Sequence, residues 1–235
     1  MNKLTKAGFA GLFLSLTAVL ASCGSSSETS SDTVAVTADV FPVTVGDLTL
    51  DAQPTRIISL SPTATEMLYA IGAGSQVVAV DEYSNYPAEA VALGTPLSGF
   101  EPNIEAISGY TPDLVIISYD PGSLVEQLST LDIPVFVAGA AMSIENVYEQ
   151  IEQLGVLTGN SQKAVEVSKS LQTGIEDAVA SVQFSEPPLS YYYELDNTYY
   201  SVTSNTFIGQ IFNLFGMRNI ADNVESGNDY PQLSA

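Results

Sequence analysis

The alternation of apolar and polar positions predicts a series of short strands and helices along most of the chain. Residues 40–50, VFPVTVGDLTL, alternate around a Gly-Asp pair, which is typical of a β-hairpin. Continuous apolar runs then predict four strands, at residues 56–60, 76–80, 113–119 and 134–139. Segments with helical character separate these runs, so we expect a parallel sheet covered on both faces. Residues 40–140 are assigned to this α/β lobe.

The segment after the first of these strands, SPTATEMLYAIGAG, carries the signals of a helix. Ser61 or Thr63 can cap its start, and the spacing of Thr63 and Glu66 suits a capping box. We therefore interpret Glu66 as a capping partner rather than a ligand contact. Gly72 and Gly74 are expected to end the helix.

A long helical region follows the fourth strand. Residues 143–182 have helical periodicity with one interruption at 158–160, where Asn160 can cap a second helix. The second helix is long for a crossover within one sheet. Residues 141–186 are therefore assigned to helices that connect two lobes.

Strand and helix signals return in residues 187–235. Apolar and aromatic runs predict strands at 189–195 and 199–203, and an amphipathic helix is expected at 205–216 with nothing regular after it. At least two of the three consecutive tyrosines at 191–193 are interpreted as packing residues. This stretch is about half the length of a typical domain, so we expect an incomplete second α/β lobe.

The N-terminal segment has the pattern of an export signal. A short basic region precedes an apolar run at residues 7–20, which is too short to span a bilayer comfortably. The run ends in LASC, which resembles the bacterial lipobox, where cleavage leaves a lipid-carrying cysteine. We expect a signal peptide at 1–22 and lipidation of Cys23; an ordinary secretory signal with an incidental Cys23 is the alternative. Residues 23–39, rich in Ser, Thr and acids, are expected to form a flexible tether.

The charge balance narrows the class of partner. The chain has 6 basic and 27 acidic residues and a net charge of −21. Such a chain is repelled by nucleic acid and by anionic lipid headgroups, so we expect no nucleic-acid partner. The hydrophobic fraction of 46% is nevertheless typical of a folded globular protein, so the acids are expected on a solvated surface.

The residue inventory argues against an enzyme. The chain has no His, and its one Cys is the predicted lipidation site, which excludes Ser-His-Asp and Cys-His catalysis. The glycine-containing stretch GAGSQ follows a helix, whereas a dinucleotide fingerprint follows a strand. No pair of acids stands out for a two-carboxylate hydrolase. We predict a non-enzymatic protein with no resident cofactor and no metal site.

Three segments, in order, resemble one family. PTRIISLSPTATEMLYAIGAGSQVVAVDEYSNYP, NIEAISGYTPDLVII and YYYELDNTYYSVTSNTFIGQIFNLFGMRNIAD are similar to substrate-binding proteins of ABC importers, in the cobalamin and ferric-siderophore branch, and the lipobox precedes them. The resemblance extends from about residue 43 to 235. It implies an α/β fold of two Rossmann-like lobes joined by one long rigid helix, with a ligand in the cleft between the lobes.

The resemblance also implies roles for particular residues. Glu105 matches an acidic surface residue that docks onto arginines of the membrane permease. Tyr230 matches a second-lobe tryptophan, and the chain ends just before the position of a second docking glutamate, so we expect the sequence to be a fragment. The ligand contacts implied for this chain are Thr63, Tyr83, Phe100, Tyr119, Tyr200 and Tyr230.

The choice of ligand rests on aromatic and cationic residues. The chain has 12 Tyr and 9 Phe but no Trp, so each tryptophan contact of the cobalamin binder would fall to Tyr or Phe. Aromatic surfaces suit a broad planar or amphipathic ligand, although each tyrosine could equally be a packing residue. Outside the signal only four cations remain, too few to match a highly anionic catecholate siderophore. A corrinoid or a near-neutral ferric hydroxamate fits better.

The predicted function is therefore capture of a cobalamin-like corrinoid or a ferric-siderophore complex outside the cell. The expected partners are an ABC permease with its ATPase, and the outer face of the bacterial membrane through lipidated Cys23. A haem binder of the same family, with a tyrosinate as the iron ligand, is an alternative, although the chain has no His and lacks partners for the haem propionates. A lipid-anchored adhesion or scaffold protein is a second alternative, of a different class.

Overall fold

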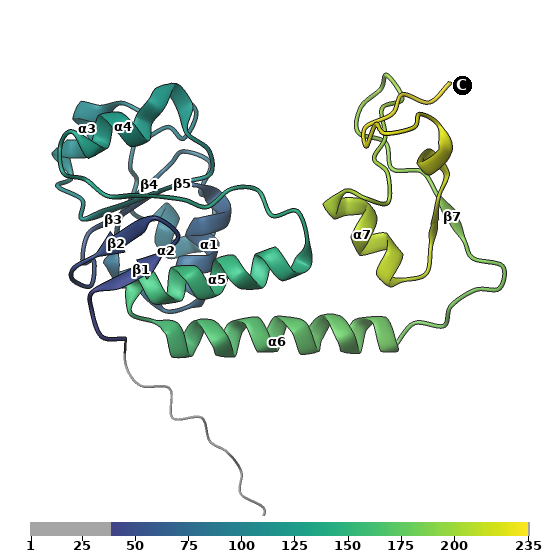
Figure 1. Ribbon diagram of the computed structural model, residues 1–235, viewed down its shortest axis with the longest axis horizontal. Helices are drawn as coiled ribbons and strands as arrows, with labels where there is room; N and C mark the ends of the chain where they lie inside the picture. Colours follow the sequence, from purple (N-terminus) through teal and green to yellow (C-terminus); the bar gives the residue numbers. More distant parts are fainter. Residues whose placement is uncertain (1–38, 235) are drawn as a thin grey trace, which may run out of the picture. The chain divides into compact units, whose positions relative to one another are not determined.

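The computed structural model describes residues 39–234, which form a mixed α/β fold (Figure 1). The signal peptide, lipidation at Cys23 and almost all of the tether predicted at 23–39 lie outside the described residues. No helix within 39–234 is long and apolar enough to cross a membrane. The boundaries proposed at 40–140, 141–186 and 187–235 remain predictions.

The fold begins with the expected β-hairpin. β1 (Val43–Val45) and β2 (Leu48–Leu50) are antiparallel. Gly46 takes a φ of 56° in the turn between them, a conformation that glycine adopts without strain. The prediction of a hairpin is confirmed.

A four-stranded parallel sheet follows, in the order β4-β3-β5-β6. Its strands are β3 (Ile57–Leu60), β4 (Val77–Val80), β5 (Leu114–Ile117) and β6 (Val135–Val137). Each matches one of the four predicted apolar runs. Every residue of β3 and β5 is buried, because helices cover both faces of the sheet.

The two faces of the sheet contribute to separate cores. Ile57, Leu114 and Ile116 pack on the face covered by α1 (Pro62–Ala70) and α5 (Ile144–Thr158). Their neighbours in β3 and β5 point to the opposite face. Figure 1 shows α3 (Ile104–Gly109) and α4 (Leu124–Ser129) on that side. Short helical turns complete this part: η1 (Ala73–Gln76), α2 (Ala88–Val91) and η2 (Pro121–Ser123).

The strand order determines where a site can form. β4 lies on one side of β3, and the chain then crosses back to place β5 on the other side. In such sheets the carboxyl ends of the strands flank a crevice at the point where the winding reverses. The loops that follow β3, β4 and β5 therefore meet at one edge of the sheet.

The caps of α1 and of α6 (Ser161–Ala180) differ in part from the predictions. Ser61 caps α1 and accepts a hydrogen bond from the Ala64 amide at 3.3 Å, so the Thr63 capping box is wrong: Thr63 lies inside the helix. Asn160 occupies the N-cap position of α6, but its side chain makes no capping bond there. The Asp39 carboxylate instead accepts from the Ser161 amide at 2.9 Å, a partner too distant in sequence to predict from spacing.

The remaining residues contain α7 (Phe207–Leu214), as expected, but less strand than predicted. β7 (Ser190–Tyr191) is two residues long and pairs in parallel with β8 (Arg218–Asn219). The strand predicted at 199–203 is wrong, since only a single bridge forms there, between Tyr200 and Gln232. β8 and η3 (Ile220–Asn223) follow Gly216, where no regular element was predicted, because two polar residues give no strand signal.

Candidate ligand-binding site

Three aromatic side chains gather at the carboxyl edge of the sheet. The ring centroids of Tyr83 and Phe100 are 5.5 Å apart in an edge-to-face arrangement, and those of Phe100 and Tyr119 are 6.2 Å apart. The three rings are 55%, 63% and 43% exposed, respectively. We call these residues the aromatic cluster. All three were predicted as ligand contacts, and the structure brings them together.

The loops that carry the aromatic cluster are fixed by backbone hydrogen bonds. Tyr83 follows β4 in a segment where Asp81 bridges to Leu97 and the Glu82 amide donates to the Leu97 carbonyl at 2.9 Å. Ser98 donates from its hydroxyl to the Glu82 carboxylate at 3.0 Å and precedes Phe100 by two residues. The loops of Tyr83 and Phe100 are therefore joined by backbone and side-chain bonds.

Tyr119 and Thr63 reach the same edge of the sheet from other strands. Tyr119 lies two residues beyond the end of β5. Thr63 is exposed in the first turn of α1, which begins directly after β3. Within residues 39–234 no hydrogen bond joins the Thr63 side chain to the aromatic cluster, so Thr63 shares its edge but makes no direct contact of that kind.

A buried polar network lies at the base of the Tyr83 loop. Asp81 is 5% exposed and its carboxylate accepts from the Ser84 hydroxyl at 2.6 Å. Burial raises the pKa of Asp81 above its usual value, against the lowering effect of the bonds from Ser84, and the nearby Glu82 carboxylate raises it further. Sequence reasoning missed Asp81, because an Asp after a strand gives no sign of burial.

Tyr200 and Tyr230 lie on two extended segments that pair with each other. The Ser201 amide donates to the Pro231 carbonyl at 3.0 Å, and the Thr203 amide donates to the Asp229 carbonyl at 2.9 Å. The Tyr200 and Tyr230 side chains are 40% and 55% exposed.

The Asp229 side chain also ties these segments to the start of α7. Its carboxylate accepts from the Thr203 hydroxyl at 2.6 Å and from the Asn205 amide at 3.0 Å. The Thr203 bond first, and then the Asn205 bond, hold the pKa of Asp229 below its usual value. Tyr230 therefore projects from a loop with a fixed backbone.

Glu105 lies in the first turn of α3, where its side chain is exposed. Asn103 caps the same helix and accepts from the Ala106 amide at 2.9 Å. A carboxylate at this position interacts favourably with the helix dipole, which is a structural reason for an acid here. An exposed carboxylate is also available to a partner.

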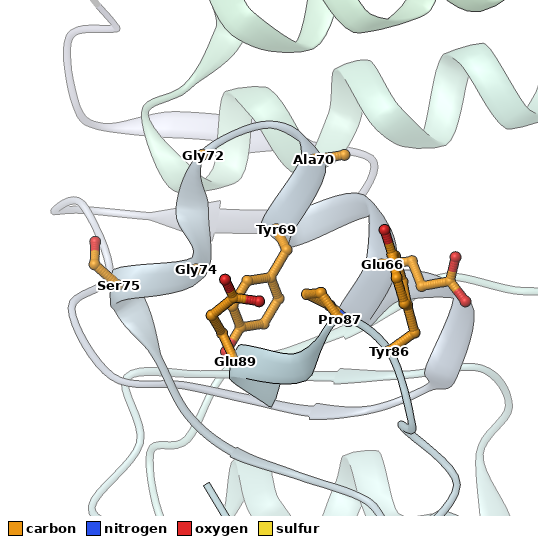
Figure 2. Close-up of a pocket in the computed structure, with 9 residues that line it drawn as sticks. All are labelled: Glu66, Tyr69, Ala70, Gly72, Gly74, Ser75, Tyr86, Pro87 and Glu89. Carbon is orange, nitrogen blue, oxygen red and sulfur yellow. The ribbon is translucent and has the colours of Figure 1, made fainter. Parts of the chain in front are cut away.

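One cavity adjoins the aromatic cluster, and a larger one lies elsewhere on the same α/β part. The larger one, of about 740 Å³, lies between α1, η1 and the start of α2, where Glu66, Glu89, Tyr69 and Tyr86 contribute side chains (Figure 2). It includes none of the predicted ligand contacts. The other, of about 260 Å³, includes Phe100 and continues along residues of α3 and α4, so it adjoins the aromatic cluster.

The cations of the described residues lie away from the aromatic cluster or are already paired. Arg56 precedes β3, at the opposite edge of the sheet, and its guanidinium donates to the Tyr110 carbonyl at 2.6 Å. Lys163 pairs with Glu166 at 3.2 Å on α6. Within residues 39–234 no group of three or more acidic, His or Cys side chains is arranged to hold a metal ion. Neither Arg56 nor Lys163 is therefore free to pair with a ligand at the aromatic cluster.

A parallel α/β sheet with exposed side chains at the carboxyl ends of its strands is an arrangement in which ligands commonly bind. A family model described as "Periplasmic binding protein" matches residues 57–235, and the chain belongs to this family. Members of the family are binding proteins and not catalysts, which agrees with the prediction that the chain is not an enzyme.

Two individual relatives are also named as binding proteins. The chain is 35% identical over 206 residues to a cobalamin-binding protein of Halobacterium salinarum, a match covering 83% of this chain and 55% of that protein. It is 29% identical over 229 residues to YvrC of Bacillus subtilis, described as an uncharacterized ABC transporter substrate-binding lipoprotein, a match covering 92% of this chain and 73% of YvrC. The chain thus spans about half the length of the first of these relatives.

A solved structure agrees with the fold. The vitamin B12-binding protein of Vibrio cholerae superimposes with a TM-score of 0.60 at 30% identity, covering 77% of this chain and 71% of that one. The predicted family and the α/β fold class are confirmed.

Proposed function

We propose that this protein captures a corrinoid or a near-neutral ferric-siderophore complex outside the cell and delivers it to an ABC importer. The observation that carries the proposal is the aromatic cluster, which lies exposed at the carboxyl edge of a parallel sheet in a chain of this family. Thr63, Tyr200 and Tyr230 are proposed as further contacts.

Exposed aromatic rings favour this class of ligand on physical grounds. Large apolar surfaces left in contact with water mark sites where a partner removes that surface from solvent. Tyr83 and Tyr119 combine an apolar face with a hydroxyl, so they can pack on a broad ring system and also bond to its polar rim. A corrinoid or a hydroxamate-wrapped iron presents such a mixed surface.

The charge distribution argues against highly anionic ligands. Arg56, the cation closest in sequence to the site, lies at the opposite edge of the sheet and already bonds to a backbone carbonyl. A ligand with several negative charges would lose its hydration at the aromatic cluster without gaining a cationic partner. A ligand of low net charge avoids this cost.

Delivery of the ligand to an importer requires a surface that docks on the permease and a position at the outer face of the membrane. Glu105 is proposed to dock on basic residues of the permease, which is supported by its exposure in the first turn of α3. Export and anchoring through Cys23 are proposed from the LASC motif and are supported by the lipoprotein relative.

A panel of ligands tests the proposal. Purified protein is titrated with cyanocobalamin, the hydroxamate complex ferrichrome, a ferric tris-catecholate and haemin, while tyrosine fluorescence is followed. We expect saturable quenching by cyanocobalamin or ferrichrome and none by the tris-catecholate. Saturation by haemin alone would point to the haem alternative, and no response to any of the four would favour an adhesion or scaffold role.

A further inference from the structure

A series of hydrogen-bonded hydroxyl groups, called here the hydrogen-bond chain, connects Asp81 with the start of α1. The Asp81 Oδ1 and Ser84 Oγ atoms are 2.6 Å apart, and Ser84 Oγ lies 2.9 Å from Thr65 Oγ1. Thr65 Oγ1 lies 2.8 Å from Ser59 Oγ, which lies 3.1 Å from the Ser61 carbonyl oxygen. These residues are at most 5% exposed, so the contacts are shielded from bulk water.

The number of hydrogen atoms available to this hydrogen-bond chain depends on whether Asp81 is protonated. Three hydroxyls supply three hydrogens, but the chain contains four donor–acceptor contacts. With an ionised carboxylate, one contact therefore brings two oxygens together with no hydrogen between them. When Asp81 is ionised, Ser84 donates to it. A proton on Asp81 supplies the fourth hydrogen and reverses that bond, so that all four bonds run in one direction, from Asp81 through Ser84, Thr65 and Ser59 to the Ser61 carbonyl.

Two loops of the aromatic cluster converge on the same carboxyl group. Ser84 follows Tyr83 directly, so the Asp81–Ser84 bond fixes the loop that carries this ring. On the other side, a Cβ placed on Gly99 would lie 3.0 Å from Asp81 Oδ2, which shows how closely the residue before Phe100 packs on Asp81. Asp81 is therefore in contact with a neighbour in sequence of each ring.

We propose that Asp81 is a positioning residue that holds Tyr83 and Phe100 in their binding arrangement while it is protonated, and that its ionisation loosens the aromatic cluster. Capture of the ligand then weakens as the pH rises through the titration of Asp81. The effect on ligand binding rests on the proposed function, whereas the protonation of Asp81 is a property of the free protein.

The surroundings of Asp81 raise its pKa on balance, although hydrogen bonds from Ser84 and from the Asp81 backbone lower it. Burial is the main reason that its pKa is raised, and the Glu82 carboxylate adds to this. The other acids on the packed segments, Glu66 of α1 and Glu101 after Phe100, are exposed. No ion pair within residues 39–234 joins Asp81 to a Lys or Arg.

The first test uses free protein and two variants. The carboxyl-carbon NMR signal of Asp81 is followed against pH, together with the nuclear Overhauser effect between the Tyr83 and Phe100 rings. We expect Asp81 to titrate above the exposed acids and the ring contact to weaken over the same interval.

In Asp81→Asn the side-chain amide can donate to Ser84 as the protonated acid does, so the ring contact should persist at all pH values. Ser84→Ala breaks the chain and should weaken the contact throughout.

A control variant separates positioning from general destabilisation. Thr158 is fully buried and donates to the Leu154 carbonyl at 2.7 Å in α5, outside the Asp81 chain. Thr158→Val should lower stability and leave the ring contact unchanged. Titration of Asp81 together with the exposed acids, or a ring contact that responds to pH equally in the wild type and Asp81→Asn, would overturn the inference.

The second test measures cyanocobalamin and ferrichrome binding across the same pH range. We expect wild-type affinity to fall about fivefold to tenfold, as for the loss of one hydrogen bond, and Asp81→Asn to keep its affinity. If neither ligand binds the wild type at any pH, the proposed function fails, and the NMR titration still decides the role of Asp81. Equal pH dependence of binding in the two proteins would contradict the coupling.

Discussion

Gly99 packs closely against the end of the sheet, beside the aromatic cluster. A Cβ at this position would lie 2.8 Å from the Leu60 carbonyl oxygen and 3.0 Å from Asp81 Oδ2. Because the first of these atoms belongs to the backbone of β3, a side chain cannot be accommodated by a rotamer change. The closeness of Gly99 keeps the Phe100 loop against the end of the sheet.

Gly99→Ala is therefore expected to shift the Phe100 loop and to lower the free energy of unfolding by about 1–3 kcal/mol. Denaturant unfolding measures the change. Gly109→Ala is the matched control, because a Cβ there meets nothing within 4 Å. Equal stability of the Gly99→Ala variant and the wild type would show that the loop has more room than the geometry indicates.

The raised pKa of Asp81 has a consequence for stability as well as for binding. The folded state holds this proton more tightly than the unfolded chain, so stability is greatest where Asp81 is protonated and is lost as the pH rises through its folded pKa. Asp81→Asn lacks this titration. We expect the stability of the variant relative to the wild type to increase with pH over that interval, as measured by thermal unfolding at several pH values. A constant difference would contradict the assigned shift.

Some residues of the site could be predicted from the sequence, and others could not. Tyr83, Phe100 and Tyr119 were found because aromatic residues at strand ends are visible in the sequence. Asp81 was missed, since its burial depends on the bridge to Leu97 and on packing by Gly99, which no local pattern encodes. Asp39 at the start of α6 was missed for the same reason.

Glycine has different roles in helices α7 and α6. Gly209 in α7 is buried, and a Cβ there would lie 2.1 Å from the Thr203 carbonyl oxygen. Gly174 in α6 is exposed, and a Cβ there would meet nothing within 4 Å. Gly209 therefore allows close packing, whereas Gly174 only weakens its helix.

The same substitution should consequently have opposite effects in the two helices. Gly209→Ala is expected to lower the free energy of unfolding by roughly 2–4 kcal/mol, because α7 must move away from the segment before it. Gly174→Ala is expected to raise it by about 0.5–1 kcal/mol. Denaturant unfolding of both variants provides the measurement, and effects of the same sign would contradict this account.

Elements with a clear apolar pattern were predictable, and those without one were not. The four strands β3 to β6 follow from continuous apolar runs, and the helices α5, α6 and α7 follow from helical periodicity. β7 and β8 are two residues each, and their pairing is decided by tertiary contacts rather than by strand propensity. The aromatic run at 199–203 favours a strand. In the structure these residues instead pair with residues 229–233 through one isolated β-bridge and a few backbone hydrogen bonds.

At the scale of the whole molecule, acidity decides which partners are compatible. With 27 acids against 6 basic residues, the surface favours a basic partner such as the proposed docking site of a permease. Glu105→Lys should therefore impair uptake of ligand by cells and leave the ligand affinity of the purified protein within about twofold. Glu126→Lys, a change of the same charge on α4, is the control and should preserve uptake. Equal uptake by both variants would argue against docking through Glu105.

Binding of the ligand by the aromatic cluster can be tested with a matched pair of truncations. Phe100 and Phe184 are similarly exposed, at 63% and 54%, but only Phe100 belongs to the cluster. Isothermal titration with cyanocobalamin or ferrichrome, whichever binds the wild type, compares Phe100→Ala with Phe184→Ala. We predict that Phe100→Ala weakens binding by at least about tenfold, while Phe184→Ala stays within about twofold of the wild type. Equal affinities of the two variants would contradict the account.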